Sequence, residues 1–211
     1  MTTARKRVPT AWAVVFLLIA VVLVFAVIRV TIDSQNIANG VIPEEGEFDR
    51  RYAQYPILAY AHIIPGVVYL VLAPFQVSRR FRNRHLDLHR KMGRFLVPTG
   101  ILSGVIGIIF GFFFSFGGLA EASAALVFGT WFVIALSLAY SYIRAGDTVR
   151  HRRWMIRAFA IGLGVGTIRI WVGLVEAIGL LDFDDAFGAA FWLAWTLHVT
   201  AAEIWLRRRP T

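Results

Sequence analysis

Apolar stretches long enough to cross a membrane recur along this chain, and they constrain its fold more than any other feature. An α-helix rises about 1.5 Å per residue, so about 20 apolar residues cross a hydrocarbon core of about 30 Å. The pattern therefore predicts an all-α integral membrane protein with six transmembrane helices. The predicted spans are roughly 11–32, 55–77, 94–116, 121–143, 155–179 and 187–206.

The segments between the apolar runs are too short to form a soluble domain. Hydrophobic residues make up 58% of the 211 residues, whereas a soluble domain is closer to half apolar. We therefore interpret 1–211 as a single membrane domain, with 1–32 as an N-terminal anchor helix and 55–206 as a five-helix core. The first apolar run exceeds the about 7–15 residues of a signal peptide and shows no small-x-small cleavage site, so we expect it to be retained.

The charges alternate along the chain in the way that six spans require. Basic residues gather before the first span, at 79–94, at 144–157 and at the C-terminus, while acidic residues gather in the other loops. The positive-inside rule then predicts that both termini lie in the cytoplasm. We expect the basic loops to bind anionic lipid headgroups. The net charge of +9 is thus no sign of nucleic-acid binding.

Five of the predicted spans carry a row of small or polar residues at helical spacing. Helices in lipid approach one another closely along such rows, so these faces should point inward. In 94–116 the row is Gly100, Gly104, Gly107 and Gly111, and in 155–179 it includes Gly162, Gly166 and Gly173. The rows equally suit a homodimer. The chain has no cysteine, which excludes disulfides, thiol catalysis and cysteine-bound metals.

Two charged residues fall on the inward face of the fifth predicted span. Arg169 and Glu176 are seven residues apart and share that face with glycines. Counting from the helix ends puts His62 and His198 at a depth similar to that of Arg169. Ionisable residues within a membrane are functional candidates, so the three predict a buried polar site. The structural alternative is a hydrogen-bonded contact that only joins helices.

Two histidines that face each other across a helix bundle can bind the iron of a b-type haem, and an arginine can hold a propionate. We expect His62 and His198 to be such iron ligands, with Arg169 as the propionate partner. His89 and His151 form a second candidate pair at the cytoplasmic side. Two pairs at two depths predict transmembrane electron transfer by haem b, with quinone as a further candidate and a redox protein as partner.

A second hypothesis needs no haem. The same buried His/Arg site would serve a small-molecule transporter or a membrane subunit that binds a partner, and the substrate-binding candidates are then Glu176, Gln76 and Tyr69. His85 and His89 are four residues apart, but this spacing is common and lacks a third metal ligand. The chain carries no P-loop, catalytic serine elbow or HExxH motif.

Three segments carry a resemblance to a known family. HIIPGVVYLVLAPFQ (62–76), HR-x-x-GR (89–94) and HRRWMIRAFA (151–160), followed by TIRIW (167–171), resemble a bacterial family of predicted membrane proteins called domain of unknown function 2306. The resemblance implies a multi-span protein of the bacterial cytoplasmic (inner) membrane and no established activity. The histidine-bearing helices also look loosely similar to b-type cytochrome and ferric reductase cores. The residues that carry the family resemblance are His62, Gln76, His89, Arg90, Gly93, Arg94, His151, Arg152, Trp154, Arg157 and Arg169.

Overall fold

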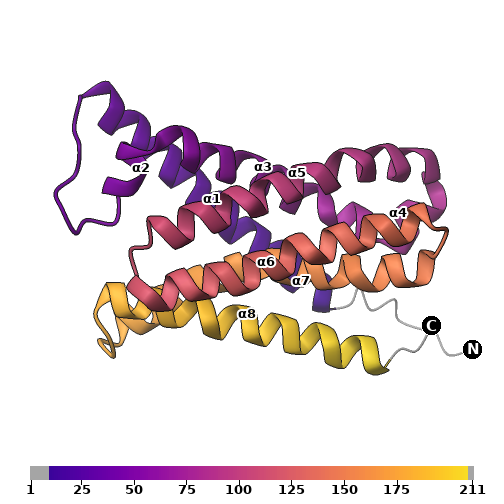
Figure 1. Ribbon diagram of the computed structural model, residues 1–211. Coiled ribbons are helices and arrows are strands. Elements are labelled where there is room, and N and C mark those ends of the chain that lie inside the picture. The colour runs from indigo at the N-terminus through magenta and orange to yellow at the C-terminus, as the bar shows by residue number, and fades with distance from the viewer. Residues whose placement is uncertain (1–9, 209–211) are drawn as a thin grey trace, which may run out of the picture.

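A computed structural model describes residues 10–208 as a bundle of helices (Figure 1). The basic residues Arg5, Lys6 and Arg7 lie outside this part of the chain. The fold is all-helical, as predicted: 87% of the described residues are in helices and none is in a strand. The helices are α1 (Thr10–Ala38), α2 (Arg50–Gln54), α3 (Pro56–Val77), α4 (Arg79–Arg84), α5 (Leu86–Phe113), α6 (Gly118–Arg144), α7 (Thr148–Ala177) and α8 (Phe183–Arg208).

Five of the six predicted spans are helices long and apolar enough to cross a membrane, namely α1, α3, α5, α6 and α7. The sixth predicted span lies within α8, which packs along α6 and α7. Its acidic first turn and its histidine, threonines and glutamate leave α8 without a membrane-length stretch as apolar as those of the other five. The structure therefore confirms a helical multi-span protein with five apolar spans.

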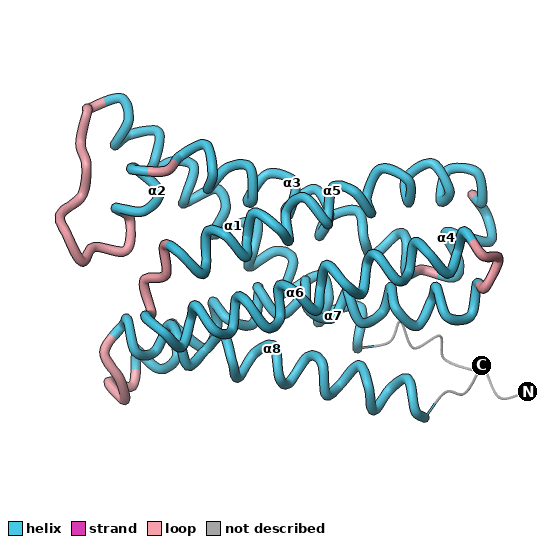
Figure 2. The backbone as a smooth tube through the Cα atoms, in the orientation of Figure 1, coloured by secondary structure: helices cyan, strands magenta, loops and turns pink. Residues whose placement is uncertain are grey.

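The segments at the two ends of the bundle differ in charge, since arginines gather in α4 and at the starts of α5 and α7, whereas acidic residues gather in the loop 39–49 and at Asp182. We call the end that holds α4 and the turn 145–147 the basic end, and the end that holds the loop 39–49 and the turns 114–117 and 178–182 the acidic end. Figure 1 shows the two ends on opposite sides of the bundle, with the last turn of α8 at the basic end. In Figure 2 the loop between α1 and α2 is the longest loop among the described helices.

The basic segments are themselves helical, which the apolar runs alone did not predict. α5 begins at Leu86 and α7 at Thr148, whereas the expected spans began near 94 and 155. Arginine and lysine are good helix formers, so the helices continue past the membrane-length runs. The Asp147 carboxylate accepts a hydrogen bond of 2.8 Å from the Arg150 backbone N–H and so caps α7. His89 and His151 therefore lie in the first turns of helices.

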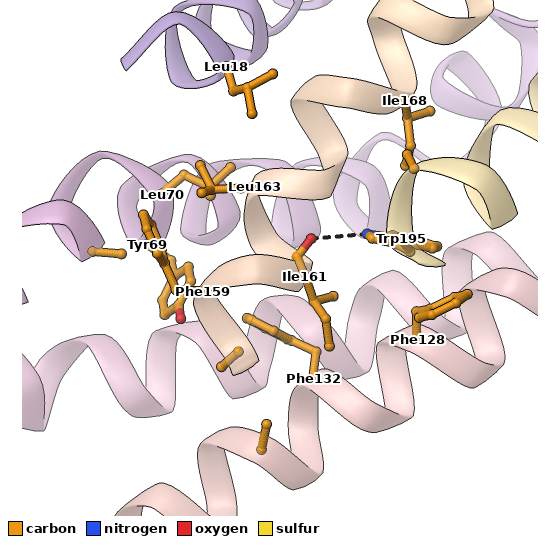
Figure 3. Close-up of a cluster of buried hydrophobic side chains, with 14 of the residues drawn as sticks. Leu18, Tyr69, Leu70, Phe128, Phe132, Phe159, Ile161, Leu163, Ile168 and Trp195 are labelled. Atoms are coloured by element: carbon orange, nitrogen blue, oxygen red, sulfur yellow. Dashed lines mark hydrogen bonds between the residues drawn. The ribbon is translucent and has the colours of Figure 1, made fainter. Parts of the chain in front are cut away.

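The core lies where side chains of the six long helices meet. Figure 3 shows Leu18 of α1, Tyr69 of α3, Phe132 of α6, Ile161 of α7 and Trp195 of α8 in one cluster, with the Trp195 indole N–H donating a 3.0 Å hydrogen bond to the Ile161 carbonyl. The predicted small-residue faces line these contacts. A Cβ on Gly100 would stand 2.8 Å from Leu136, and one on Gly162 would stand 3.2 Å from Leu70.

The contact between α1 and α7 depends on a single glycine. A Cβ on Gly166 would stand 2.6 Å from the backbone carbonyl oxygen of Leu18. Backbone cannot rotate away as a side chain can, so a larger residue would push α1 outward. Two turns further along α7, a Cβ on Gly173 would meet no atom within 4 Å. The two helices are thus closely packed at Gly166, and α7 is open at Gly173.

Replacing Gly166 with alanine is expected to destabilise the fold by about 1–3 kcal/mol, because overpacking costs that much in a well-packed contact. The Gly173→Ala variant is the matched control on the same helix. It is expected to stabilise the helix by up to about 1 kcal/mol, since alanine is the better helix former. Equilibrium unfolding in mixed detergent micelles measures both. Equal stability of the two variants would contradict the packing of α1 on α7.

Candidate functional site

Buried charged side chains gather at the acidic end, and we call Arg29, Asp33, Asp49, Arg51 and Glu121 the acidic-end cluster. Asp33 is 1% exposed and Glu121 is 2% exposed. Arg29 donates hydrogen bonds to Asp33 and to Asp49, which ties α1 to the segment before α2. The Tyr60 hydroxyl of α3 donates a 2.7 Å hydrogen bond to the other oxygen of Asp33. The cluster thus joins three segments through ion pairs that are shielded from water.

Arg51 and Glu121 form the most buried contact of this cluster between distant parts of the chain. An Arg51 N–H donates a 2.9 Å bond to Glu121 Oε1 and a 3.0 Å bond to the Phe114 carbonyl. The second Glu121 oxygen accepts bonds of 2.7 and 2.8 Å from the backbone N–H groups of Phe116 and Gly117. Burial disfavours the charged form of Arg51, but Tyr52 and Glu121 outweigh this effect and raise its pKa.

Aromatic rings surround the same cations. The Arg51 guanidinium carbon lies 4.8 Å from the Phe48 ring centre and 5.4 Å from that of Phe187. Arg169 of α7 lies 5.5 Å from the Phe187 ring centre and 5.8 Å from that of Phe25. Because the negative ring faces attract cations, the rings help to hold both arginines away from water.

Arg169 faces this cluster, as the sequence predicted for an inward residue. Its electrostatic neighbours are Tyr52, Arg51 and Glu121. His62 lies within electrostatic range of Arg169, so two of the three predicted residues share one region. Glu176 does not join them: it is exposed and borders a hollow at the turn between α7 and α8. The expectation that Glu176 faces inward is wrong, because α7 extends beyond its packed neighbours there.

His62 is held between α3 and α5. Its Nδ1–H donates a 2.8 Å hydrogen bond to the Ser103 carbonyl, and the Ser103 hydroxyl donates a 2.9 Å bond to the His62 carbonyl. The ring covers Gly107, where a Cβ would stand 2.6 Å from Nδ1. Since a carbonyl can only accept, Nδ1 carries the proton and Nε2 is left as an acceptor.

His198 belongs to a different helix pair. Its Nε2 shares a 2.7 Å hydrogen bond with the Thr167 hydroxyl, which joins α8 to α7. Thr167 and Arg169 are two residues apart on α7 and so point to opposite sides of that helix. His62 lies within electrostatic range of Arg169, whereas the hydrogen bond to Thr167 holds His198 on the α8 side of α7.

A second cluster of polar residues lies at the basic end. It consists of His89, His151 and Gln76, and we call it the basic-end site. His89 in the first turn of α5 and His151 in the first turn of α7 are close enough to interact electrostatically. The His151 Nδ1–H donates a 2.9 Å hydrogen bond to the carbonyl of Ala139, a fully buried residue of α6. The site thus brings together the starts of two helices that are 62 residues apart in the chain.

Three buried polar atoms without a partner lie at the basic-end site or beside it. They are His89 Nδ1, Gln76 Nε2 and the Tyr69 hydroxyl; the other such atoms among the described residues are Nε of Arg29, Nε of Arg51 and the Trp171 indole nitrogen. Gln76 borders α5, because its Oε1 lies 3.4 Å from the position of a Cβ on Gly93. Buried polar groups are rarely left unpaired, so these atoms are suited to a ligand.

A row of polar residues along α3 runs from His62 to the basic-end site. His62, Tyr69 and Gln76 are each seven residues apart and so lie on one face, with about 10 Å of rise between neighbours. Tyr69 sits midway, with its ring 5.3 Å from that of Phe132.

The α8 helix is fixed to the basic end by Arg157 and Glu203, which form two hydrogen bonds of 2.5 and 3.0 Å.

Other candidates do not form a site. His85 is exposed at the end of α4, its ring centre 5.4 Å from that of Phe81. Within residues 10–208 no group of three or more His, Cys, Asp or Glu side chains is placed to hold a metal ion.

Sequence reasoning missed Arg51, Asp33 and Glu121. The signal was present, since Asp33 and Glu121 stand at the margins of apolar runs, but their partners lie far away in sequence.

The comparisons with known proteins agree with this architecture. Residues 59–206 match the model of a family described as predicted membrane protein (DUF2306). The chain belongs to this family. It is therefore a multi-pass membrane protein of a family whose description names no activity. Comparisons with curated proteins and with solved structures found no match.

The family match divides the polar residues into two sets. Both histidines and the glutamine of the basic-end site lie inside the matched range, as do His62, Glu121 and Arg169. Arg29, Asp33, Asp49 and Arg51 precede it. The basic-end site therefore falls wholly within the family region, whereas the acidic-end cluster is completed by the first helix and the loop after it.

Proposed function

We propose that this protein binds one haem b between His89 and His151 and carries electrons in the bilayer. The observation that carries the proposal is that His89 and His151, in the first turns of two different helices at the basic end, lie within electrostatic range of each other. A b-type haem takes one nitrogen from each of two histidines. In this chain, that requirement is best met at the basic-end site.

The hydrogen bonds of the site suit iron ligation. A metal-binding histidine commonly donates its other ring N–H to a backbone carbonyl, which fixes the ring and leaves one nitrogen for the metal. His151 makes this bond to Ala139 with Nδ1, so Nε2 is the nitrogen left for iron. The buried Nδ1 of His89 and Nε2 of Gln76 add polar atoms that have no partner of their own.

The charges around the pair suit a haem's propionates. Arg82 and Arg90 act electrostatically on His89, and arginine binds carboxylates through paired hydrogen bonds. Haem b, when bound, supplies reversible one-electron chemistry. The chain's own residues would hold the iron, orient the imidazoles and neutralise the propionates. The neighbouring Gln76 and Tyr69 extend the polar row toward His62.

The proposal is limited to one haem. His62 and His198 were the other candidate pair, but His198 Nε2 is bonded to Thr167 and His62 packs on Gly107 of α5. Their present partners therefore do not favour a shared iron. His62 and Arg169 instead support ligand binding at the acidic end, in line with the second hypothesis of a buried His/Arg site.

We also propose an orientation. With α8 as a sixth span, both ends of the described chain lie on the side of α4, and the positive-inside rule puts that side in the cytoplasm of a bacterial cell. The basic end would then meet anionic lipid headgroups and a cytoplasmic redox partner.

Haem content of purified variants tests the proposed ligands. Wild-type protein produced with ample haem is expected to hold about one haem per chain, and His89→Ala and His151→Ala are expected to lose at least about nine-tenths of it, because one imidazole holds b-type haem weakly. His85→Ala is the matched control, since His85 is four residues from His89 and exposed. Equal haem content in His85→Ala and His89→Ala would overturn the assignment.

A further inference from the structure

Beside the acidic-end cluster lies a further arginine, Arg169 of α7, that forms no ion pair with a carboxylate among the described residues. Arg29 and Arg51 each form ion pairs, with Asp33, Asp49 and Glu121. Arg169 has no carboxylate within 4.0 Å in residues 10–208; its guanidinium interacts with the Tyr52 side chain and contacts the rings of Phe25 and Phe187 instead. An arginine in low dielectric is costly without an anion, so the lack of a partner needs an explanation.

The nearby carboxylates are already occupied. One Glu121 oxygen accepts from Arg51 and the other accepts from two backbone N–H groups. The two oxygens of Asp33 accept from Arg29 and from Tyr60. Neither acid can turn to Arg169 without breaking a buried bond. The guanidinium of Arg169 therefore has donors to offer to a group from outside the chain.

The position of Arg169 indicates where that group would come from. Arg169 lies eight residues before the end of α7, which is about 12 Å along the helix axis. Its guanidinium reaches toward Tyr52 and toward Glu121, which stands in the first turn of α6. The first turn of α6 is where an apolar, membrane-length helix begins, so the guanidinium lies near the boundary at which the apolar spans end. The cation is therefore within reach of an anion held at the membrane surface.

The side of α7 next to Arg169 is open. A Cβ on Gly173, one turn further toward the acidic end, would meet no atom within 4 Å. Phe25 of α1, on which Arg169 rests, is 44% exposed. The seam between α1 and α7 is closed at Gly166, where a Cβ would meet the Leu18 carbonyl. An amphiphile can thus approach Arg169 from the bilayer beside α1, with its tail along the exposed apolar side chains.

We propose that Arg169 binds the anionic head of a membrane amphiphile, a carboxylate or a phosphate, at a lateral site between α1 and α7. Both heads match the planar donor pair of a guanidinium. The two sources are a free fatty acid and an anionic phospholipid. Phe25 and Phe187 position the guanidinium, and His62 lies within electrostatic range of it.

Native mass spectrometry of the full-length protein, delipidated in detergent, tests this site with three probes: oleate, phosphatidylglycerol and uncharged oleyl alcohol. Wild-type protein is expected to bind one copy of oleate or phosphatidylglycerol at least about tenfold more tightly than the alcohol, and whichever anion binds identifies the source. Arg169→Gln is expected to lose about tenfold in that affinity, and Arg169→Lys to lose less because it keeps the charge.

Arg208→Gln is the matched control, since Arg208 is an exposed arginine at the other end of the bundle. It should bind the anion as the wild type does. Equal binding by Arg169→Gln and wild type, or equal binding of oleate, phosphatidylglycerol and the alcohol by the wild type, would overturn the proposal. Haem content is measured on the same samples and should be unchanged in Arg169→Gln, so failure of this site is distinguishable from failure of the proposed haem.

Discussion

The Glu121→Ala variant is expected to lose about 3–5 kcal/mol of unfolding free energy, because removing one member of a buried ion pair leaves the other charge uncompensated. Arg51 is buried under four aromatic rings and its only carboxylate partner within the described residues is Glu121, at 2.9 Å. The variant also removes the acceptor for the backbone N–H groups of Phe116 and Gly117. Equilibrium unfolding in mixed detergent micelles measures the loss.

Asp87→Ala serves as the control, because Asp87 and Arg90 form an ion pair that is largely exposed and 4.0 Å long. Exposed pairs are worth about 0–1 kcal/mol, so this variant should unfold nearly as the wild type does. The double variant Arg51→Met/Glu121→Leu should recover much of the loss, since apolar replacements of both partners leave no buried charge. A loss below about 1 kcal/mol in Glu121→Ala would contradict the burial of this pair.

Phe187→Ala is expected to destabilise the protein by a similar amount, about 3–5 kcal/mol, through the cavity it leaves. Phe187 is 1% exposed and packs against the rings of Phe48, Phe116 and Phe191. It also provides the ring face for Arg51 and Arg169. The same unfolding assay in micelles measures this loss.

Phe113→Ala is the comparison, since Phe113 is 68% exposed at the end of α5 and leaves no enclosed space when truncated. Its unfolding free energy should stay within about 0.5 kcal/mol of the wild type, as for other surface changes. If Phe113→Ala cost as much as Phe187→Ala, Phe187 would not anchor the acidic end.

The fold followed from patterns that are local in sequence. Membrane-length apolar runs predicted five of the spans, and glycine rows predicted the packed faces: Gly100, Gly104 and Gly162 all meet side chains of neighbouring helices. These features need only the 3.6-residue period of a helix. The early starts of α5 and α7 were not predicted, because charged residues end an apolar run without ending a helix.

The polar clusters were harder to predict, because their partners are distant in sequence. Arg51 and Glu121 are 70 residues apart, and no spacing in either segment indicates the other. Glu176 shows the opposite error. Its spacing from Arg169 predicted an inward position, but the helices around α7 no longer cover it at that level. Helical phase gives a direction, and only the neighbouring helices decide what that direction faces.

The absorption spectrum of the purified wild-type protein, oxidised and then reduced with dithionite, tests the central claim most directly. Iron held by His89 and His151 should give a Soret band and, on reduction, sharp α and β bands typical of two nitrogen ligands. A protein that was produced with ample haem and shows neither band would contradict the claim that these two histidines hold a haem.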